Sequence, residues 1–128
     1  MNRKQIQKML EHYDKPGLEC DGATRVFSWL LKEVKTPHTI MFGQLDFTRL
    51  SAKEKSRDEV VYPHYWIELD DGFIIDFKAR MWLGDEPEVP HGVFKLDEFP
   101  AALYVGHATK LLVTKTVFEM LTREFACD

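Results

Sequence analysis

Cysteine is scarce in this sequence: Cys20 and Cys127 are the only two among 128 residues. Two thiols in a chain with 45% hydrophobic residues do not resemble the disulfide framework of a small secreted domain. We therefore expect a reducing compartment, namely the cytoplasm, or a host cytoplasm into which a phage protein or effector is delivered. Cys127, next to the end of the sequence, is interpreted as incidental.

Long apolar runs and concentrated charge are also lacking. The charged segment at residues 1–8 is not followed by an apolar stretch, so we expect neither a signal peptide nor a membrane span. The net charge is −4, with acidic and basic residues interspersed. No basic stripe alternates with aromatic residues, so we expect no nucleic-acid partner. The length fits one domain over residues 1–128, without repeats or linkers.

Apolar periodicity predicts an α+β fold in which helices pack on a mostly antiparallel sheet. Helices are expected at residues 2–12, at 20–34 and after the N-cap Thr114. Strands are expected at 38–47 with a bulge at Gly43, at 60–69, at 73 to about 82, at 93–95 and at 103–105. Residues 48–59 are interpreted as a polar surface loop, and 84–92 as a proline- and glycine-punctuated loop bordering a pocket.

A glycine-ended turn decides which side chains share a face of the expected hairpin. A two-residue turn at Asp71-Gly72 would put Asp76 on the face opposite His64. A three-residue turn at 70–72 instead pairs Trp66 with Asp76, and a glycine readily adopts the positive φ that ends such a loop. We favour the second turn, which leaves His64 and Asp76 about 7 Å apart between backbones. It places four residues on one face, which we expect to line a cleft: His64, Trp66, Glu68 and Asp76.

Cys20, His64 and Asp76 are residue types that together perform nucleophilic catalysis. A helix N-terminus stabilises a thiolate, an imidazole takes the thiol proton, and a carboxylate orients the imidazole. Backbone N–H groups at the helix start would also stabilise an oxyanion. Asp21 disfavours a thiolate unless its carboxylate points away from the sulfur. Taken singly, Cys20 could be a small core residue, and His64 and Asp76 ordinary hydrogen-bonded strand or turn residues.

The segment His64-Tyr-Trp-Ile-Glu-Leu-Asp-Asp-Gly-Phe-Ile-Ile-Asp76 resembles the transglutaminase-like branch of the papain-like cysteine enzyme superfamily. The segment that begins at Cys20 resembles its nucleophile helix, and the resemblance covers residues 18–80. It implies a papain-like, transglutaminase-like fold with the nucleophilic cysteine at a helix N-terminus. Cys20 would be the nucleophile, His64 the general base and Asp76 the orienter. The chain departs from papain-type peptidases in having no Gly-x-Cys-Trp box and no glutamine a few residues before Cys20.

Two functions stay open at this point. The first is a small thiol hydrolase or acyltransferase acting on an amide bond, of cysteine peptidase, deamidase or transglutaminase type, with a protein or peptide substrate. The second is a catalytically inactive binding or regulatory protein of the same fold, of phage or effector origin. The missing glutamine and the adjacent Asp21 favour the second, and the ordered Cys-His-Asp set favours the first.

Three further residues are candidates for substrate contact: Trp66, Glu68 and His91. Trp66 and Glu68 share the predicted face of His64, and His91 lies in the loop at 84–92. Trp66 could shield the site or donate its indole N–H, and simple solvent exposure is the alternative for Glu68 and His91. No recognised ligand spacing connects the histidines and carboxylates, so we expect no metal and no cofactor. Trp82 is expected in the core rather than in a pocket wall.

Overall fold

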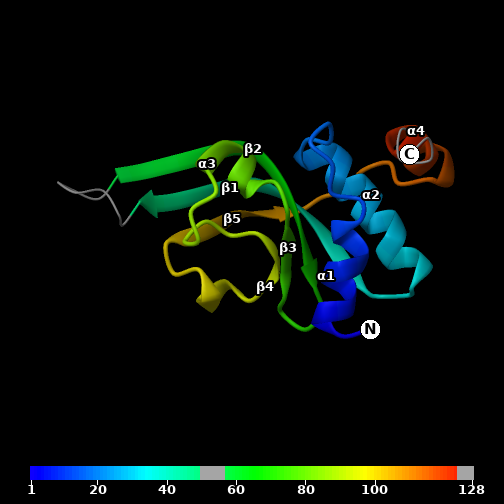
Figure 1. Cartoon of the computed structure of the whole chain (residues 1–128), viewed down its shortest axis with the longest axis horizontal. Helices are drawn as coiled ribbons and strands as arrows, with labels where there is room; N and C mark the ends of the chain where they lie inside the picture. The colour runs from blue at the N-terminus through cyan, green and yellow to red at the C-terminus, as the bar shows by residue number, and fades with distance from the viewer. Residues whose placement is uncertain (50–56, 124–128) are drawn as a thin grey trace.

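A five-stranded antiparallel sheet organises the chain (Figure 1), which the computed structural model describes over residues 1–49 and 57–123. The strands lie in the order β4-β3-β2-β1-β5. Their bounds are β1 His38–Arg49, β2 Arg57–Leu69, β3 Ile74–Asp76, β4 Gly92–Phe94 and β5 Ala102–Ala108. Every pairing is antiparallel. The fold is a small mixed α+β domain, as the periodicity predicts.

Helices α1 (Arg3–Glu11), α2 (Cys20–Glu33) and α4 (Lys115–Thr122) gather at one end of the sheet, as Figure 1 shows. Asn2 caps α1 and Thr114 caps α4 by accepting hydrogen bonds from backbone N–H groups. One face of α2 is buried against the sheet together with α1, through Ala23, Val26, Phe27 and Leu31. Val34 is 37% exposed, since the helix ends one residue before it. No helix in the described part of the chain is both long and apolar enough to traverse a bilayer.

Strands β1 and β2 form the longest pairing in the sheet and reach beyond the helices (Figure 1). The register shifts between Gly43 and Leu45, which confirms the bulge expected at Gly43. The interpretation of 48–59 as a loop is wrong at both ends. Thr48 and Arg49 pair with Asp58 and Arg57, because this hairpin continues its hydrogen-bond ladder past the apolar run. The middle of that segment, 50–56, lies outside the described residues.

The turn between β2 and β3 has the geometry that the sequence predicts. Ile67 pairs with Ile75 and Glu68 with Ile74, which is the register of a three-residue turn at 70–72. Gly72 has a φ of +92°, a left-handed value that favours glycine. Since pairing residues share a face, Asp76 lies on the face of β2 that carries His64 and Trp66.

The strand expected from 73 to about 82 is wrong after Asp76. A short helix, α3 (Ala79–Leu83), follows β3 instead. Asp76 Oδ1 accepts hydrogen bonds from the backbone N–H groups of Lys78 at 2.9 Å and Ala79 at 3.1 Å. A short acidic side chain that binds backbone N–H groups two and three residues ahead ends a strand and starts a helix.

The face that carries His64 and Trp66 is covered, so the expectation that it lines an open cleft is wrong. Residues after β3 fold back over it, including a 3₁₀ helix, η1 (Leu96–Glu98). His64 is 0% exposed, Trp66 1% and Asp76 3%. The residues that cover this face and pack against it are Ala79, Leu83, Val89, Phe94, Leu96, Phe99 and Tyr104. Both faces of the central strands are therefore buried, by helices on one side and by this returning segment on the other.

Candidate active site

The structure brings Cys20, His64 and Asp76 together from three elements. Cys20 is the first residue of α2, His64 lies in β2, and Asp76 is the last residue of β3. The three-residue turn gives His64 and Asp76 a common face, and their side chains meet with His64 Nε2 at 2.7 Å from Asp76 Oδ2. Because an ionised carboxylate only accepts hydrogen bonds, Nε2 carries a proton and donates it. Nδ1 is then the nitrogen available to Cys20.

Both carboxylate oxygens of Asp76 are fully engaged. Oδ1 accepts the two backbone N–H groups at the start of α3. Oδ2 accepts the hydroxyl of Tyr104 at 2.7 Å in addition to the His64 ring. Four donors around one buried carboxylate fix its position and leave it little freedom to rotate.

These contacts set the charges of the buried groups. Burial acts to raise the pKa of Asp76, but attraction to His64 and the hydrogen bonds from His64, Lys78 and Tyr104 hold it below its ordinary value. Burial, together with the Asp76 charge, raises the pKa of Tyr104 well above its ordinary range. Asp76 is therefore ionised and Tyr104 neutral at pH 7, which suits an acceptor and its donor.

His64 is held in its charged form despite being buried. Burial disfavours the imidazolium, yet the charge and hydrogen bond of Asp76, with smaller contributions from Cys20, raise the pKa of His64 to about 10. His64 Nδ1 is buried and has no hydrogen-bond partner of ordinary geometry among the described residues. An imidazolium next to a thiol, with one N–H free of other partners, stabilises the thiolate.

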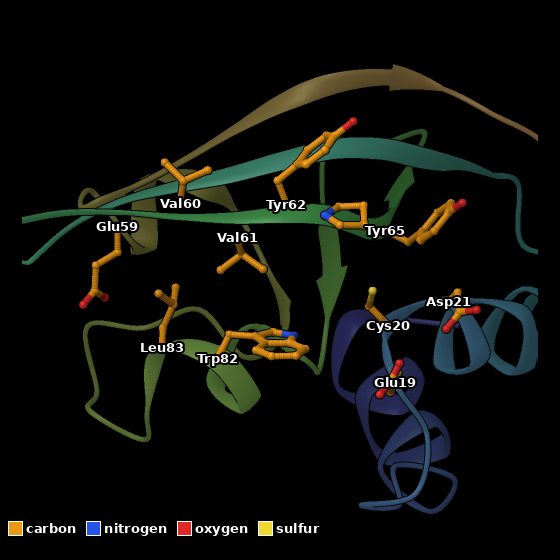
Figure 2. A pocket seen from close by; sticks show the side chains of 11 residues that line it. Glu19, Cys20, Asp21, Glu59, Val60, Val61, Tyr62, Tyr65, Trp82 and Leu83 are labelled. Carbon is orange, nitrogen blue, oxygen red and sulfur yellow. The ribbon is translucent and has the colours of Figure 1, made fainter.

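Cys20 combines a free thiol, partial exposure and a helix N-terminus. Glu19, the N-cap residue, makes no side-chain hydrogen bond to the helix. The first N–H groups of a helix have no partner within it, so those at Cys20 and Asp21 are donors left over by the helix itself. In the view of Figure 2 the sulfur is directed toward β2, and the carboxylate of Asp21 is turned to the other side. The thiol therefore points toward the strand that carries His64, and it interacts with that ring.

A cleft of about 560 Å³ opens on Cys20 (Figure 2). It runs along β2 between the start of α2 and the short helix α3. Its lining consists of Glu19, Cys20, Asp21, Glu59, Val60, Val61, Tyr62, Pro63, Tyr65, Trp82 and Leu83. Among the three triad candidates, only Cys20 reaches this surface, and the fully buried ring of His64 lies behind it. This arrangement exposes the thiol to the cleft and shields the imidazole from water.

Trp66 does not contact this cleft, so its expected role in substrate contact is wrong. Its ring lies 6.1 Å from the His64 ring and 5.0 Å from the Tyr104 ring, centroid to centroid. A Cβ added to Gly106 would come within 2.7 Å of the Trp66 ring, so the indole fills the space above that glycine. Trp66 is a packing residue that holds His64 and Tyr104 in place.

The other expected contact residues lie apart from the cleft. Glu68 accepts a long hydrogen bond of 3.4 Å from the indole N–H of Trp66. His91 packs on the Phe77 ring at 5.0 Å and faces a separate groove. The structure thus brings neither Glu68 nor His91 to Cys20. Cys127 lies outside the described residues.

The sequence did not predict the roles of two residues: Trp82, which lines the cleft, and Tyr104, which binds Asp76. Trp82, expected in the core, is 60% exposed and lines the cleft, because α3 turns its ring away from the sheet. In Figure 2 this ring points from α3 toward Cys20. Tyr104 lies 28 residues after Asp76. Its only sequence signal was the short strand expected at 103–105, which does not say which strand it would pair with.

Lys78 fixes the segment that precedes Cys20. Its ammonium is 2.8 Å from Asp14 Oδ1 and donates to the carbonyl of Lys15 at 2.9 Å. The Lys78 side chain is 6% exposed. Because the Lys78 backbone also binds Asp76, one residue connects the chain entering α2 with the carboxylate of the triad.

Comparison of the chain with protein-family models, with curated proteins and with solved structures finds no match in any of the three. The inference of a function therefore depends on the residues and geometry described above.

Proposed function

We propose that this protein is a small thiol hydrolase or acyltransferase that acts on an amide bond through Cys20, His64 and Asp76. The observation that supports it best is the Asp76–His64 pair buried behind a partly exposed thiol at a helix start. The transglutaminase-like resemblance and the papain-like fold that it implies belong to the same proposal. A thiol, an imidazole and a carboxylate that meet in this order from three separate elements are typical of nucleophilic catalysis.

The proposed reaction starts from a thiolate–imidazolium pair. The Cys20 sulfur adds to the amide carbonyl carbon, and the resulting oxyanion accepts hydrogen bonds from backbone N–H groups at the start of α2. The C–N bond then breaks as His64 gives its Nδ1 proton to the leaving amine, which leaves a thioester on Cys20. Water or a second amine attacks the thioester, His64 takes the proton of that nucleophile, and the thiolate is restored.

Asp76 and Tyr104 do not touch the substrate in this scheme. Asp76 keeps the proton on Nε2, so that Nδ1 exchanges its proton with sulfur and substrate. Tyr104 holds the carboxylate in line with the ring. Both are positioning residues, and Cys20 and His64 are the catalytic ones.

The rate of iodoacetamide alkylation of Cys20 as a function of pH tests this proposal. The protein carries Cys127→Ser so that one thiol is observed. We expect fast alkylation already at pH 6, and a loss of about tenfold or more at that pH in His64→Gln, since the glutamine has no charge to stabilise a thiolate. Circular dichroism of His64→Gln controls for folding, and His64→Asn provides a second variant. Slow alkylation at pH 6 in the parent would contradict the proposal and favour an inactive binding protein.

A further inference from the structure

The charged side chains that line the cleft at Cys20 are all acidic. Its lining contains the carboxylates of Glu19 and Asp21 on either side of Cys20, and none of the lining residues is a lysine, arginine or histidine. Glu19 and Asp21 are exposed and flank the nucleophile. A concave surface with charge of one sign focuses its potential and attracts ligands of the opposite sign. A cationic ligand group is therefore favoured there and an anionic one is repelled.

The walls of the same cleft are apolar and unusually exposed. Val60 is 58% exposed, Tyr62 66% and Trp82 60%. Clusters of large apolar side chains in solvent mark binding surfaces in soluble domains. Aromatic rings beside carboxylates suit a lysine or arginine in particular, because its stem packs on the ring while its charge reaches the acid.

The cleft follows a strand edge and is long. It extends along β2 from Glu59 to Tyr65, which is about 20 Å at the rise of a strand. On this edge the neighbouring strand β3 pairs only with Ile67 and Glu68, so β2 has no described strand partner there. An extended polypeptide can bind beside such an edge through its main chain. The dimensions exceed those of a single amino acid.

From this charge, apolar wall and length, we infer that the acyl donor is an extended polypeptide segment with a lysine or arginine next to an apolar side chain. The cation faces Glu19 and Asp21, and the apolar side chain packs against Val60 and Trp82. This inference rests on the proposed function, since it assigns the substrate class of the same thiol.

Matched peptide probes test the inference on the full chain carrying Cys127→Ser. The probes are three hexapeptides that differ only at the residue after a phenylalanine, which is lysine, glutamine or glutamate. Each carries a chloroacetamide, and the Cys20 thiolate displaces its chloride to form a thioether. We expect the lysine probe to label Cys20 at least about fivefold faster than the glutamate probe, a difference that falls in roughly 0.5 M salt. A single-residue chloroacetamide of lysine should react more slowly than the lysine hexapeptide.

Charge reversal provides the control. The double variant Glu19→Lys, Asp21→Lys should invert the ratio of lysine to glutamate labelling, and this ratio cancels any change in thiol reactivity. Glu33→Lys, at the opposite end of α2 and about 20 Å away at 1.5 Å per residue, should leave the ratio unchanged. Equal rates for all probes, with fast iodoacetamide alkylation retained, would overturn the substrate class alone. Equal rates for the hexapeptide and the single residue would overturn the polypeptide part. Slow alkylation by iodoacetamide itself would reject the proposed function instead.

Discussion

Tyr104 and His64 both donate a hydrogen bond to the same oxygen of Asp76, although they lie on different strands of the sheet. The Tyr104 hydroxyl and the His64 Nε2–H each lie 2.7 Å from Asp76 Oδ2. Tyr104 comes from the edge strand β5, and β1 separates that strand from the one carrying His64. A carboxylate held between two donors keeps the imidazole in one orientation, so the geometry of the candidate triad depends on a residue outside it.

Tyr104→Phe should lower both stability and thiol reactivity. The variant keeps the ring packing on Trp66 but removes a buried hydrogen bond to a charged acceptor, and we expect a loss of about 1.5–3 kcal/mol in the free energy of unfolding. Iodoacetamide alkylation at pH 6 should slow by a few-fold. Urea denaturation measures the first effect. A double-mutant cycle with Asp76→Asn isolates the coupling between the two residues, and strict additivity would show that the hydrogen bond contributes nothing.

Asp76→Asn should shift the titration of His64. The amide preserves the size of the side chain but removes the charge that raises the pKa of His64 to about 10. The midpoint of the ring in an NMR titration should therefore fall, and each unit of that fall corresponds to about 1.4 kcal/mol of lost interaction with the imidazolium. An unchanged NMR midpoint would mean that Asp76 does not determine the charge of the ring.

Folding stability should depend on pH through the same pair. The pKa of His64 is raised in the folded protein, from its ordinary 6.5 to about 10. Its contribution is therefore fully present below pH 6.5 and is lost as the pH rises through about 10. The lowered pKa of Asp76 acts in the opposite sense, because its contribution is present above the ordinary carboxyl range and is lost as the pH falls.

The melting temperature of the parent minus that of His64→Gln measures this dependence. The difference in melting temperature should be largest near pH 6 and should shrink steadily toward pH 10. For a domain of this size, a change of 1 kcal/mol in stability corresponds to roughly 4 °C. A difference that grows toward pH 10 would contradict the assigned direction for His64.

Gly106→Ala should be strongly destabilising, although the residue is exposed. An added Cβ would meet the Phe42 carbonyl and lie 2.7 Å from the Trp66 ring. Since backbone and a packed indole cannot move freely, we expect a loss of about 2 kcal/mol or more, as for other overpacked sites. Gly17→Ala is the matched control, because nothing lies within 4 Å of a Cβ there and the change should be near neutral. Thermal unfolding of both variants checks the contrast, and equal melting temperatures would mean that β5 adjusts to the methyl group.

Much of the local structure follows from local sequence. The bounds of α2, the bulge at Gly43 and the turn at 70–72 agree with the structure within a residue or two. Each depends on features within a few positions, such as the apolar spacing of α2 or the glycine that accepts a positive φ. The meeting of His64 with Asp76 belongs to this group, because the turn length alone sets their common face.

Whether a side chain is buried or exposed could not be predicted from the local sequence in the same way. Trp66, placed in a cleft by its polar neighbours, is buried because the segment after β3 returns over that face. Trp82, placed in the core by its hydrophobicity, is exposed because Asp76 turns the chain into α3. Both outcomes depend on where distant segments of the chain pack, and the periodicity within one strand does not predict that packing.

The sequence by itself determined the bounds of α2, the register of the β2–β3 hairpin and the identity of three residues able to form a catalytic group, since these depend on features close together in the chain. Only the tertiary structure decided that Tyr104 supports the carboxylate, that Lys78 fixes the approach to Cys20, and that an acidic, apolar-walled cleft opens on the thiol. Those features join residues tens of positions apart, and long-range packing sets which of them meet.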